Sequence, residues 1–174
     1  TLNLTTQKII SKQEYVDLIE NEIVSIITNK KIRVQKGLIE LINEVFTLLF
    51  EKLLNNDIKV SWTHGDFQQA NILLTHETYK VIDWEASEKR FFMYDAFTLL
   101  GGIRQGEPLI SAISNFKNEI NSIDYIEEVN ESSIILLLIE ELRFNINETF
   151  SVNFYESGIQ TEILCNAIKT YIDE

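Results

Sequence analysis

Two runs near the start of the chain carry apolar residues at helical spacing. The first predicts a helix over 12–28, and Ser11-Lys12-Gln13-Glu14 has the spacing of a capping box at its start. The second predicts a helix over 32–54, which Asn55-Asn56-Asp57 should end because their side chains compete for the backbone. The apolar positions are Val16, Ile19, Ile23, Ile26 and Ile27 in the first run, and Leu38, Ile42, Val45, Leu49 and Leu53 in the second.

The middle of the chain has the character of short strands. Residues 58–62 alternate between apolar and polar, and the β-rich runs 71–74 and 79–83 are joined across 75–78 like a hairpin. Helical spacing then returns, and the predicted helices are 94–104, 108–120, 132–149 and 157–172, with Ile159, Ile163, Ala167 and Ile168 as the apolar stripe of the last. The predicted fold class is therefore mainly α with a small β-hairpin insert.

Composition limits the classes of protein that fit. The chain has 174 residues, of which 45% are hydrophobic and 24% charged, as in a soluble globular protein. Its longest apolar run, 134–139, is too short to span a membrane, and no secretion signal opens the chain. The single cysteine, Cys165, cannot form an internal disulfide and is expected to be a small buried residue. These features favour a cytoplasmic protein without membrane association.

The net charge of −12 has the wrong sign for a nucleic-acid binder, and no basic stripe is present. Two interpretations of the acidity stay open. It either solvates the surface or provides a field that attracts a cationic small molecule.

A group of polar residues between the predicted strands is the candidate site. His64-Gly65-Asp66-Phe67-Gln68-Gln69-Ala70-Asn71 precedes one strand, and Asp83 ends the next and is followed by Trp84-Glu85. Phosphoryl transfer from ATP needs one carboxylate to orient the acceptor hydroxyl, and oxygen ligands to hold Mg²⁺ against the phosphates. Asp66, Asn71 and Asp83 supply these residue types in the order and spacing that such chemistry uses.

His-Gly-Asp-x-x-x-x-Asn followed by Ile-Asp-Trp-Glu resembles the aminoglycoside phosphotransferase and choline kinase superfamily. These enzymes have a protein-kinase-like fold and phosphorylate small molecules. The resemblance implies that Asp66 is the catalytic base and that Asn71 and Asp83 bind Mg²⁺ and, through it, ATP or another nucleoside triphosphate. It also implies that Asp95, in Tyr94-Asp95-Ala96, anchors the catalytic loop.

Three other residues receive lesser roles. His64 is expected to support the catalytic loop through hydrogen bonds. Glu85 is adjacent to a predicted metal ligand, and its expected role is to support that ligand or the substrate. His76 falls in the predicted hairpin turn and is expected to be exposed.

The sequence contains no motif of the kind with which a kinase covers its nucleotide. The six glycines form neither Gly-x-Gly-x-x-Gly nor a Walker-type loop. We therefore expect residues 1–174 to be a kinase-like C-terminal catalytic lobe, with the N-terminal nucleotide lobe of the same protein absent. On its own, such a lobe is expected to be inactive.

The acceptor is expected to be a small molecule that binds among the C-terminal helices over 108–172. An aminoglycoside, a choline-like amino alcohol and a sugar all stay open, the first two being cationic. The acidic candidates for contacting it are Glu140, Glu141, Glu148, Glu156 and Glu162.

Two rival interpretations belong to other classes. One is a non-catalytic kinase-like binding module or scaffold, which an upstream lobe without its lysine would favour. The other is a metal-dependent hydrolase that uses His64, Asp66 and Asp83, although two histidines in the whole chain supply few nitrogen ligands for zinc.

Overall fold

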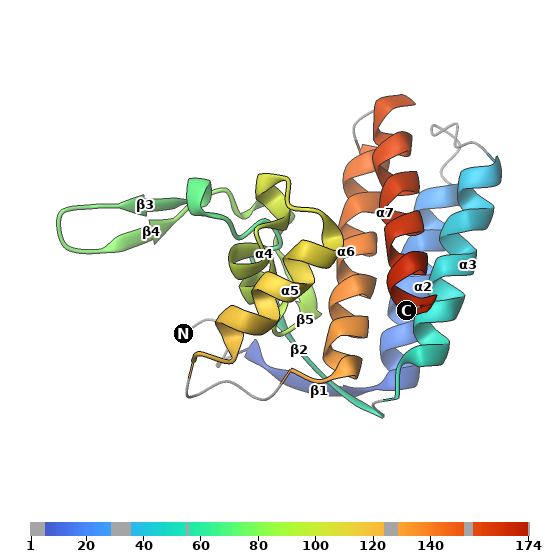
Figure 1. Ribbon diagram of the computed structural model, residues 1–174, viewed down its shortest axis with the longest axis horizontal. Coiled ribbons are helices and arrows are strands. Elements are labelled where there is room, and N and C mark those ends of the chain that lie inside the picture. Colours follow the sequence, from blue (N-terminus) through green and yellow to red (C-terminus); the bar gives the residue numbers. More distant parts are fainter. Residues whose placement is uncertain (1–5, 29–35, 55, 124–128, 152–154, 174) are drawn as a thin grey trace. The chain divides into compact units, whose positions relative to one another are not determined.

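The computed structural model describes residues 6–28, 36–54, 56–123, 129–151 and 155–173 (Figure 1). The chain divides into two compact units. Unit 1 consists of Thr1–Ile9 and Lys59–Leu137, and unit 2 of Ile10–Ile58 and Leu138–Glu174. Every residue proposed above for catalysis, metal binding or loop support falls in unit 1.

Short antiparallel strands frame the candidate site. Strand β2 (Asp57–Thr63) pairs with β5 (Glu88–Phe91), with Val60 opposite Phe91 and Thr63 opposite Glu88. Strand β1 (Lys8–Ser11) lies on the other side of β2, so the strand order is β1-β2-β5. Strands β3 (Ile72–Leu74) and β4 (Tyr79–Val81) form a separate hairpin, which Figure 1 shows extending away from the rest of its unit.

Two helices of unit 1 pack closely after β5. Helix α4 (Tyr94–Gly101) contacts α5 (Leu109–Ile120), and the rings of Phe97 and Phe116 meet edge to face at 5.6 Å. At Gly101, a Cβ atom would lie 2.9 Å from the carbonyl oxygen of Ala112, so a larger residue would push the helices apart. A 3₁₀ turn, η3 (Ile103–Gln105), connects them.

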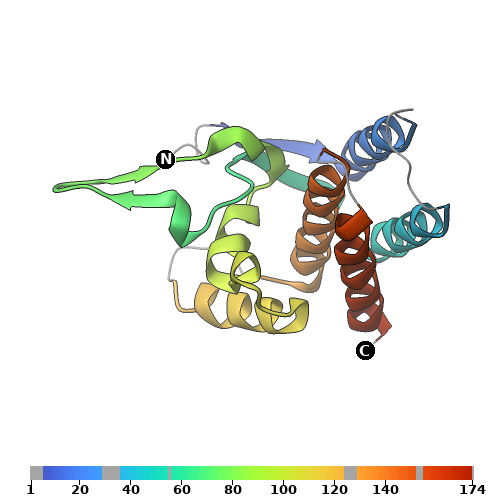
Figure 2. The ribbon, with the colours of Figure 1, turned by 90° about the horizontal axis from the view of Figure 1, so that it is seen from above.

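Unit 2 is built from α2 (Lys12–Thr28), α3 (Lys36–Lys52), α7 (Tyr155–Asp173) and the second part of α6 (Glu131–Ser151). Helix α3 packs against α7, and Figures 1 and 2 show these two helices side by side. Residues 132–142 of α6 are all buried. The six consecutive apolar residues 134–139 give this part of the helix apolar side chains on every face, as expected for a buried helix.

Polar residues buried in unit 2 are paired with one another. Glu140 has no exposed surface, accepts a hydrogen bond from the Tyr15 hydroxyl at 2.7 Å, and pairs with Arg143 at 3.2 Å. Arg143 also contacts Glu22 at 2.6 Å. A buried charge is tolerated when it is paired and hydrogen-bonded in this way.

Most predicted elements are confirmed, but the extent of the β structure and the length of one helix need correction. The backbone N–H of Glu14 donates to Ser11 Oγ at 3.1 Å, so the predicted cap is present. The β structure exceeds a hairpin, since β1 and β5 were missed; both are only four residues long. The 94–104 prediction was too long, because α4 ends at Gly101 and Gly102 adopts a left-handed conformation.

The predicted apolar stripe of α7 is partly wrong. Ile159 and Ile163 are 53% and 56% exposed, whereas Thr161 and Cys165 are fully buried. Thr161 can lie on the buried face because its hydroxyl forms hydrogen bonds with Thr149 and Asn145, each at 2.8 Å. Ile168 is buried as predicted. Residues 32–35 of the predicted second helix lie outside the described residues.

Candidate active site

The loop after β2 carries the first group of candidate residues. It runs from His64 to Asn71, ends in the 3₁₀ turn η1 (Gln69–Asn71), and leads into β3. His64 and Asn71 are 1% and 8% exposed, while the Asp66 side chain is 25% exposed. Both ends of the loop are therefore buried, and the Asp66 carboxylate between them is accessible to solvent.

Helix α4 anchors this loop through its first turn. The Asp95 carboxylate accepts the backbone N–H groups of His64 at 2.8 Å and Gly65 at 3.0 Å. The Thr98 hydroxyl donates to the carbonyl of Phe67 at 3.0 Å. Burial raises the pKa of Asp95, although the two backbone bonds, His64 and Arg90 oppose that rise. Two polar side chains of α4, Asp95 and Thr98, thus stabilise the loop conformation through hydrogen bonds to its backbone.

The amide of Asn71 is oriented by Asp66. Its Nδ2 atom donates to the backbone carbonyl of Asp66 at 2.9 Å and to Oδ2 of the same residue at 3.1 Å. Because both partners are acceptors, the nitrogen must face them. Oδ1 is then the atom of this side chain that can serve a cation.

The β3–β4 hairpin brings Asp83 next to this loop. The N–H of Ile82 donates to the carbonyl of Asn71 at 3.0 Å, and His64 Nε2 lies 2.7 Å from the carbonyl of Ile82. Since a carbonyl only accepts, Nε2 carries the proton in that contact. Asp83 itself is exposed and adopts a left-handed backbone, φ 64°, as no other non-glycine residue of the described part does. Such conformations often mark functional positions.

Gly65 allows the loop after Asp83 to approach closely. Its φ is +86°, and an added Cβ would lie 2.5 Å from the carbonyl oxygen of Ala86. The Arg90 guanidinium fills the remaining space, because Nη1 donates to that carbonyl at 2.9 Å and to Thr63 Oγ1 at 3.2 Å. Arg90 is 2% exposed, pairs with Glu88, and lies over the Tyr94 ring. It therefore connects both loops to β5 and α4.

Two residues that the sequence did not single out contact Asp66. Gln68 Nε2 lies 3.2 Å from Oδ1 and 3.0 Å from Oδ2 of Asp66, and Arg104 Nε lies 3.3 Å from Oδ1. The two-residue spacing to Gln68 could have indicated the first contact. Arg104 belongs to a separate turn, and no signal in the sequence pointed to it.

Other expected residues lie apart from these contacts. Glu85 is exposed in the 3₁₀ turn η2 (Trp84–Ala86), and His76 is exposed as predicted. Among the acceptor candidates, Glu140 and Glu141 are buried and Glu140 is already paired, so neither is open to a ligand. Glu148 and Glu162 belong to unit 2, whereas the site residues belong to unit 1. The side chain of Glu156 is outside the described part of the chain.

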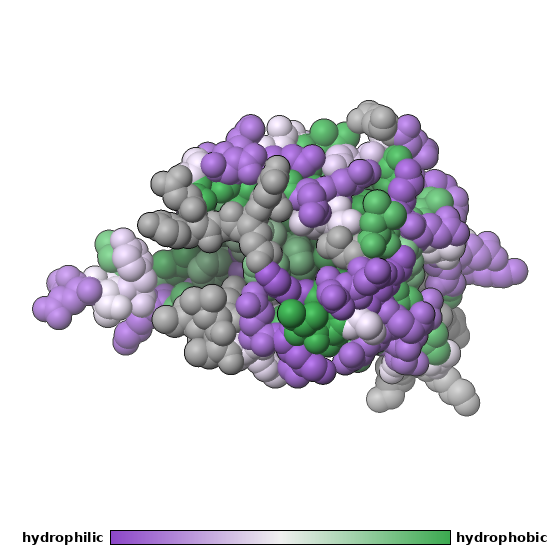
Figure 3. Space-filling model, turned by 90° about the horizontal axis from the view of Figure 1, so that it is seen from below, coloured by the Kyte–Doolittle hydropathy of each residue, from purple (hydrophilic) through white to green (hydrophobic). Residues whose placement is uncertain are grey.

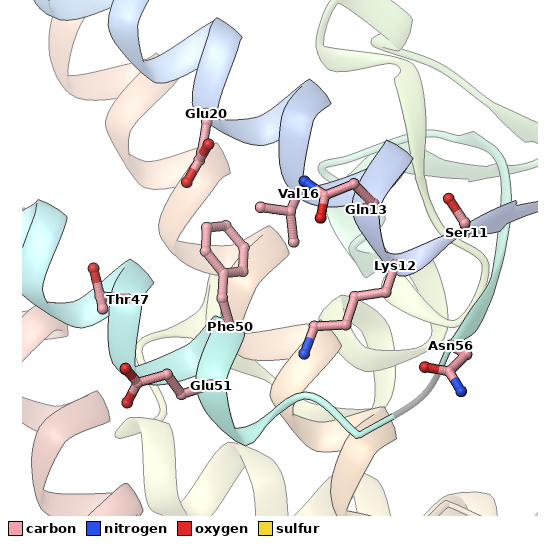
Figure 4. A pocket seen from close by; sticks show the side chains of 9 residues that line it. All are labelled: Ser11, Lys12, Gln13, Val16, Glu20, Thr47, Phe50, Glu51 and Asn56. Atoms are coloured by element: carbon pink, nitrogen blue, oxygen red, sulfur yellow. The ribbon is translucent and has the colours of Figure 1, made fainter.

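A hollow in unit 2 is lined by none of these site residues. Figure 4 shows Val16 of α2 and Phe50 of α3 pointing into the space between their helices. Lys12 at its edge donates to the carbonyl of Leu53 at 2.6 Å. The residues that line it are Ser11, Lys12, Gln13, Val16, Glu20, Thr47, Phe50, Glu51 and Asn56.

Comparison with protein families decides the class of the chain. The model of the phosphotransferase enzyme family (APH) matches residues 29–118, more than half of the 174 residues. The chain belongs to this family. The match includes Asp66, Asn71 and Asp83, and it confirms the resemblance to the aminoglycoside phosphotransferase and choline kinase superfamily drawn from the motifs. No curated protein matches the chain.

The surface and the described helices were also compared with the features of membrane and metal-binding proteins. Hydrophilic residues make up much of the face in Figure 3, with hydrophobic residues between them. Within the described residues, no helix is long and apolar enough to cross a membrane. The same residues contain no group of three or more His, Cys, Asp and Glu side chains that could hold a metal ion.

Proposed function

We propose that this chain is the catalytic lobe of a Mg²⁺- and ATP-dependent phosphotransferase that acts on a hydroxyl group of a small molecule. Family membership supports phosphoryl transfer. The observation that carries the finer proposal is the contact between Asn71 and Asp66, which orients a carboxylate and an amide oxygen within one loop. In this proposal Asp66 accepts the proton of the acceptor hydroxyl.

The donor chemistry near Asp83 fits magnesium. Mg²⁺ prefers oxygen ligands and keeps several waters, so one carboxylate and one amide oxygen are sufficient protein ligands. Asn71 has its nitrogen committed to Asp66, which leaves its oxygen, and Asp83 presents an exposed carboxylate beyond the Ile82–Asn71 backbone bond. When bound, the ion would neutralise phosphate charge, and Asn71 and Asp83 are the residues that would hold it.

We further propose that another part of the full-length protein covers the nucleotide. A kinase needs backbone donors over the phosphates and a lysine that pairs with them. None of the six glycines in the 174 residues forms such a loop. The isolated chain should therefore bind Mg-ATP weakly and turn over slowly compared with the full-length protein.

Phosphate transfer from radiolabelled ATP to a panel of aminoglycosides, amino alcohols and sugars tests the proposal. With the full-length protein, Asp66→Asn should lower kcat by about 10²–10⁴-fold, the usual contribution of a positioned base. Mg-ATP affinity, measured by calorimetry, should stay within a few-fold. Asp57→Asn makes the same chemical change at an exposed position outside the site and should leave kcat unchanged.

Three outcomes would contradict parts of this proposal. Full turnover in Asp66→Asn removes that residue as the base. Folded full-length protein that binds Mg-ATP but neither hydrolyses it nor phosphorylates any panel member favours the scaffold interpretation. Unchanged Mg²⁺ dependence of turnover in Asp83→Asn removes Asp83 as a metal ligand.

A further inference from the structure

Side chains from two different parts of unit 1 contact the carboxylate of Asp66. Gln68 and Asn71 belong to the same loop as Asp66 and reach it with amide nitrogens at 3.0–3.2 Å. Arg104 lies on η3, beyond helix α4, and its Nε atom is 3.3 Å from Oδ1. Contacts within a loop move with that loop. Asp95 and Thr98 of α4 hold the backbone of that loop, and Arg104 adds a contact from a separate turn to the carboxylate itself.

The guanidinium of Arg104 is itself held in place. Its Nη2 atom donates to the Tyr94 hydroxyl at 2.7 Å, and Tyr94 is completely buried in the first turn of α4. The turn that carries Arg104 is bounded by Gly102 and Gly106, with φ of 73° and 89°. The N–H of Gln105 closes the turn on the carbonyl of Gly102 at 2.9 Å. Little freedom is left for this side chain.

Low exposure makes the contact between Arg104 and Asp66 stronger than a surface ion pair. The two side chains are 12% and 25% exposed, so water screens their charges only in part. The hydrogen bond to Tyr94 keeps the guanidinium in one position. The positive charge of Arg104 therefore acts on Oδ1 of Asp66 from a fixed direction.

We propose that Arg104 is a positioning residue for Asp66, holding Oδ1 in the orientation in which it meets the acceptor hydroxyl. This inference rests on the proposed function, because it assigns Arg104 to the base of that reaction. Arg104 acts through Asp66 and not on the nucleotide. Its loss should slow the chemical step and leave the binding of Mg-ATP intact.

Steady-state kinetics of the full-length protein with ATP and its best panel acceptor test the role. Arg104→Met removes the charge and keeps much of the volume, and kcat should fall roughly 10- to 100-fold, the cost of a misplaced reacting group. KM for ATP should stay within twofold. Arg104→Lys should recover part of kcat, since it keeps charge without the planar group. Lys52→Met, which removes an exposed cation from unit 2, is the matched control and should behave as the wild type.

A double-mutant cycle separates positioning from a general structural effect. In the Asp66→Asn background, Arg104→Met should lower residual turnover by less than twofold, because the group that it positions is already gone. Tyr94→Phe keeps the ring and removes the hydroxyl that holds Arg104, so it should reproduce part of the kcat loss. This variant also keeps the proposal testable where Arg104→Met fails to fold, which thermal unfolding would reveal.

The outcomes distinguish this inference from the proposed function. Wild-type kcat in folded Arg104→Met, a rise in KM for ATP without a fall in kcat, or additive losses in the cycle would each overturn the role of Arg104. Full activity of Asp66→Asn would instead overturn the assignment of the base, whatever Arg104 does.

Discussion

Replacing Gly65 by alanine is the sharpest structural test of how the catalytic loop is held. Gly65 has φ +86°, where an L side chain is strained, and its Cβ would lie 2.5 Å from the Ala86 carbonyl oxygen and 2.6 Å from Arg90 Nη1. The Arg90 atom can move, but only by weakening its bonds to Ala86 and Thr63. The carbonyl is backbone and can move only with the loop after Asp83.

Gly106 provides a matched control that separates the cost of the left-handed backbone from the cost of a steric clash. Gly106 has a similar φ, +89°, and nothing within 4 Å of the position of an added Cβ. Gly106→Ala should therefore show the backbone cost alone, about 1–2 kcal/mol. Gly65→Ala should add the cost of forcing a methyl group into filled space, a further 1–3 kcal/mol or so.

Thermal and urea unfolding of both variants measure the difference. For a chain of this length, each kcal/mol lowers Tm by about 2–4 °C. Gly65→Ala should thus unfold several degrees below Gly106→Ala. In the full-length protein the same substitution should also abolish phosphoryl transfer, because the loop carries Asp66. A Gly65→Ala variant as stable as Gly106→Ala would refute the close approach between this loop and Ala86.

Two further predictions follow from buried titratable groups. Burial, with a smaller effect from Glu162, raises the pKa of the Cys165 thiol to about 12. A disulfide reagent at pH 8 should therefore label the chain only after unfolding. Rapid labelling of the folded protein would contradict the burial of Cys165. Burial also raises the pKa of Asp95 above its ordinary 3.8, so its stabilisation is complete below about pH 4 and declines as pH rises through the folded-state pKa. The free energy of urea unfolding of the wild type, relative to Asp95→Asn, should accordingly decrease from pH 4 to 8, and a constant difference would disprove the shift.

The sequence by itself determined the helices and the motif. Apolar residues at intervals of three and four predicted α2 and α3 closely, because helical periodicity is a local property of the chain. The spacing of Asp66, Asn71 and Asp83 was sufficient to indicate phosphoryl transfer, and the family match agrees. The four-residue strands β1 and β5 were missed, since short strands depend on partners that lie elsewhere in the sequence.

Only the tertiary structure decided which side chains meet. The resemblance implied that Asp95 anchors the loop, and the structure supplies its partners, the backbone N–H groups of His64 and Gly65. Arg104 reaches Asp66 from a turn beyond α4, and this contact leaves no periodic signal because it depends on tertiary packing. The same holds for α7, where buried hydrogen bonds allow Thr161 to lie on the inner face while Ile159 and Ile163 are exposed. Spacing identifies candidate chemistry, and packing selects the residues that position it.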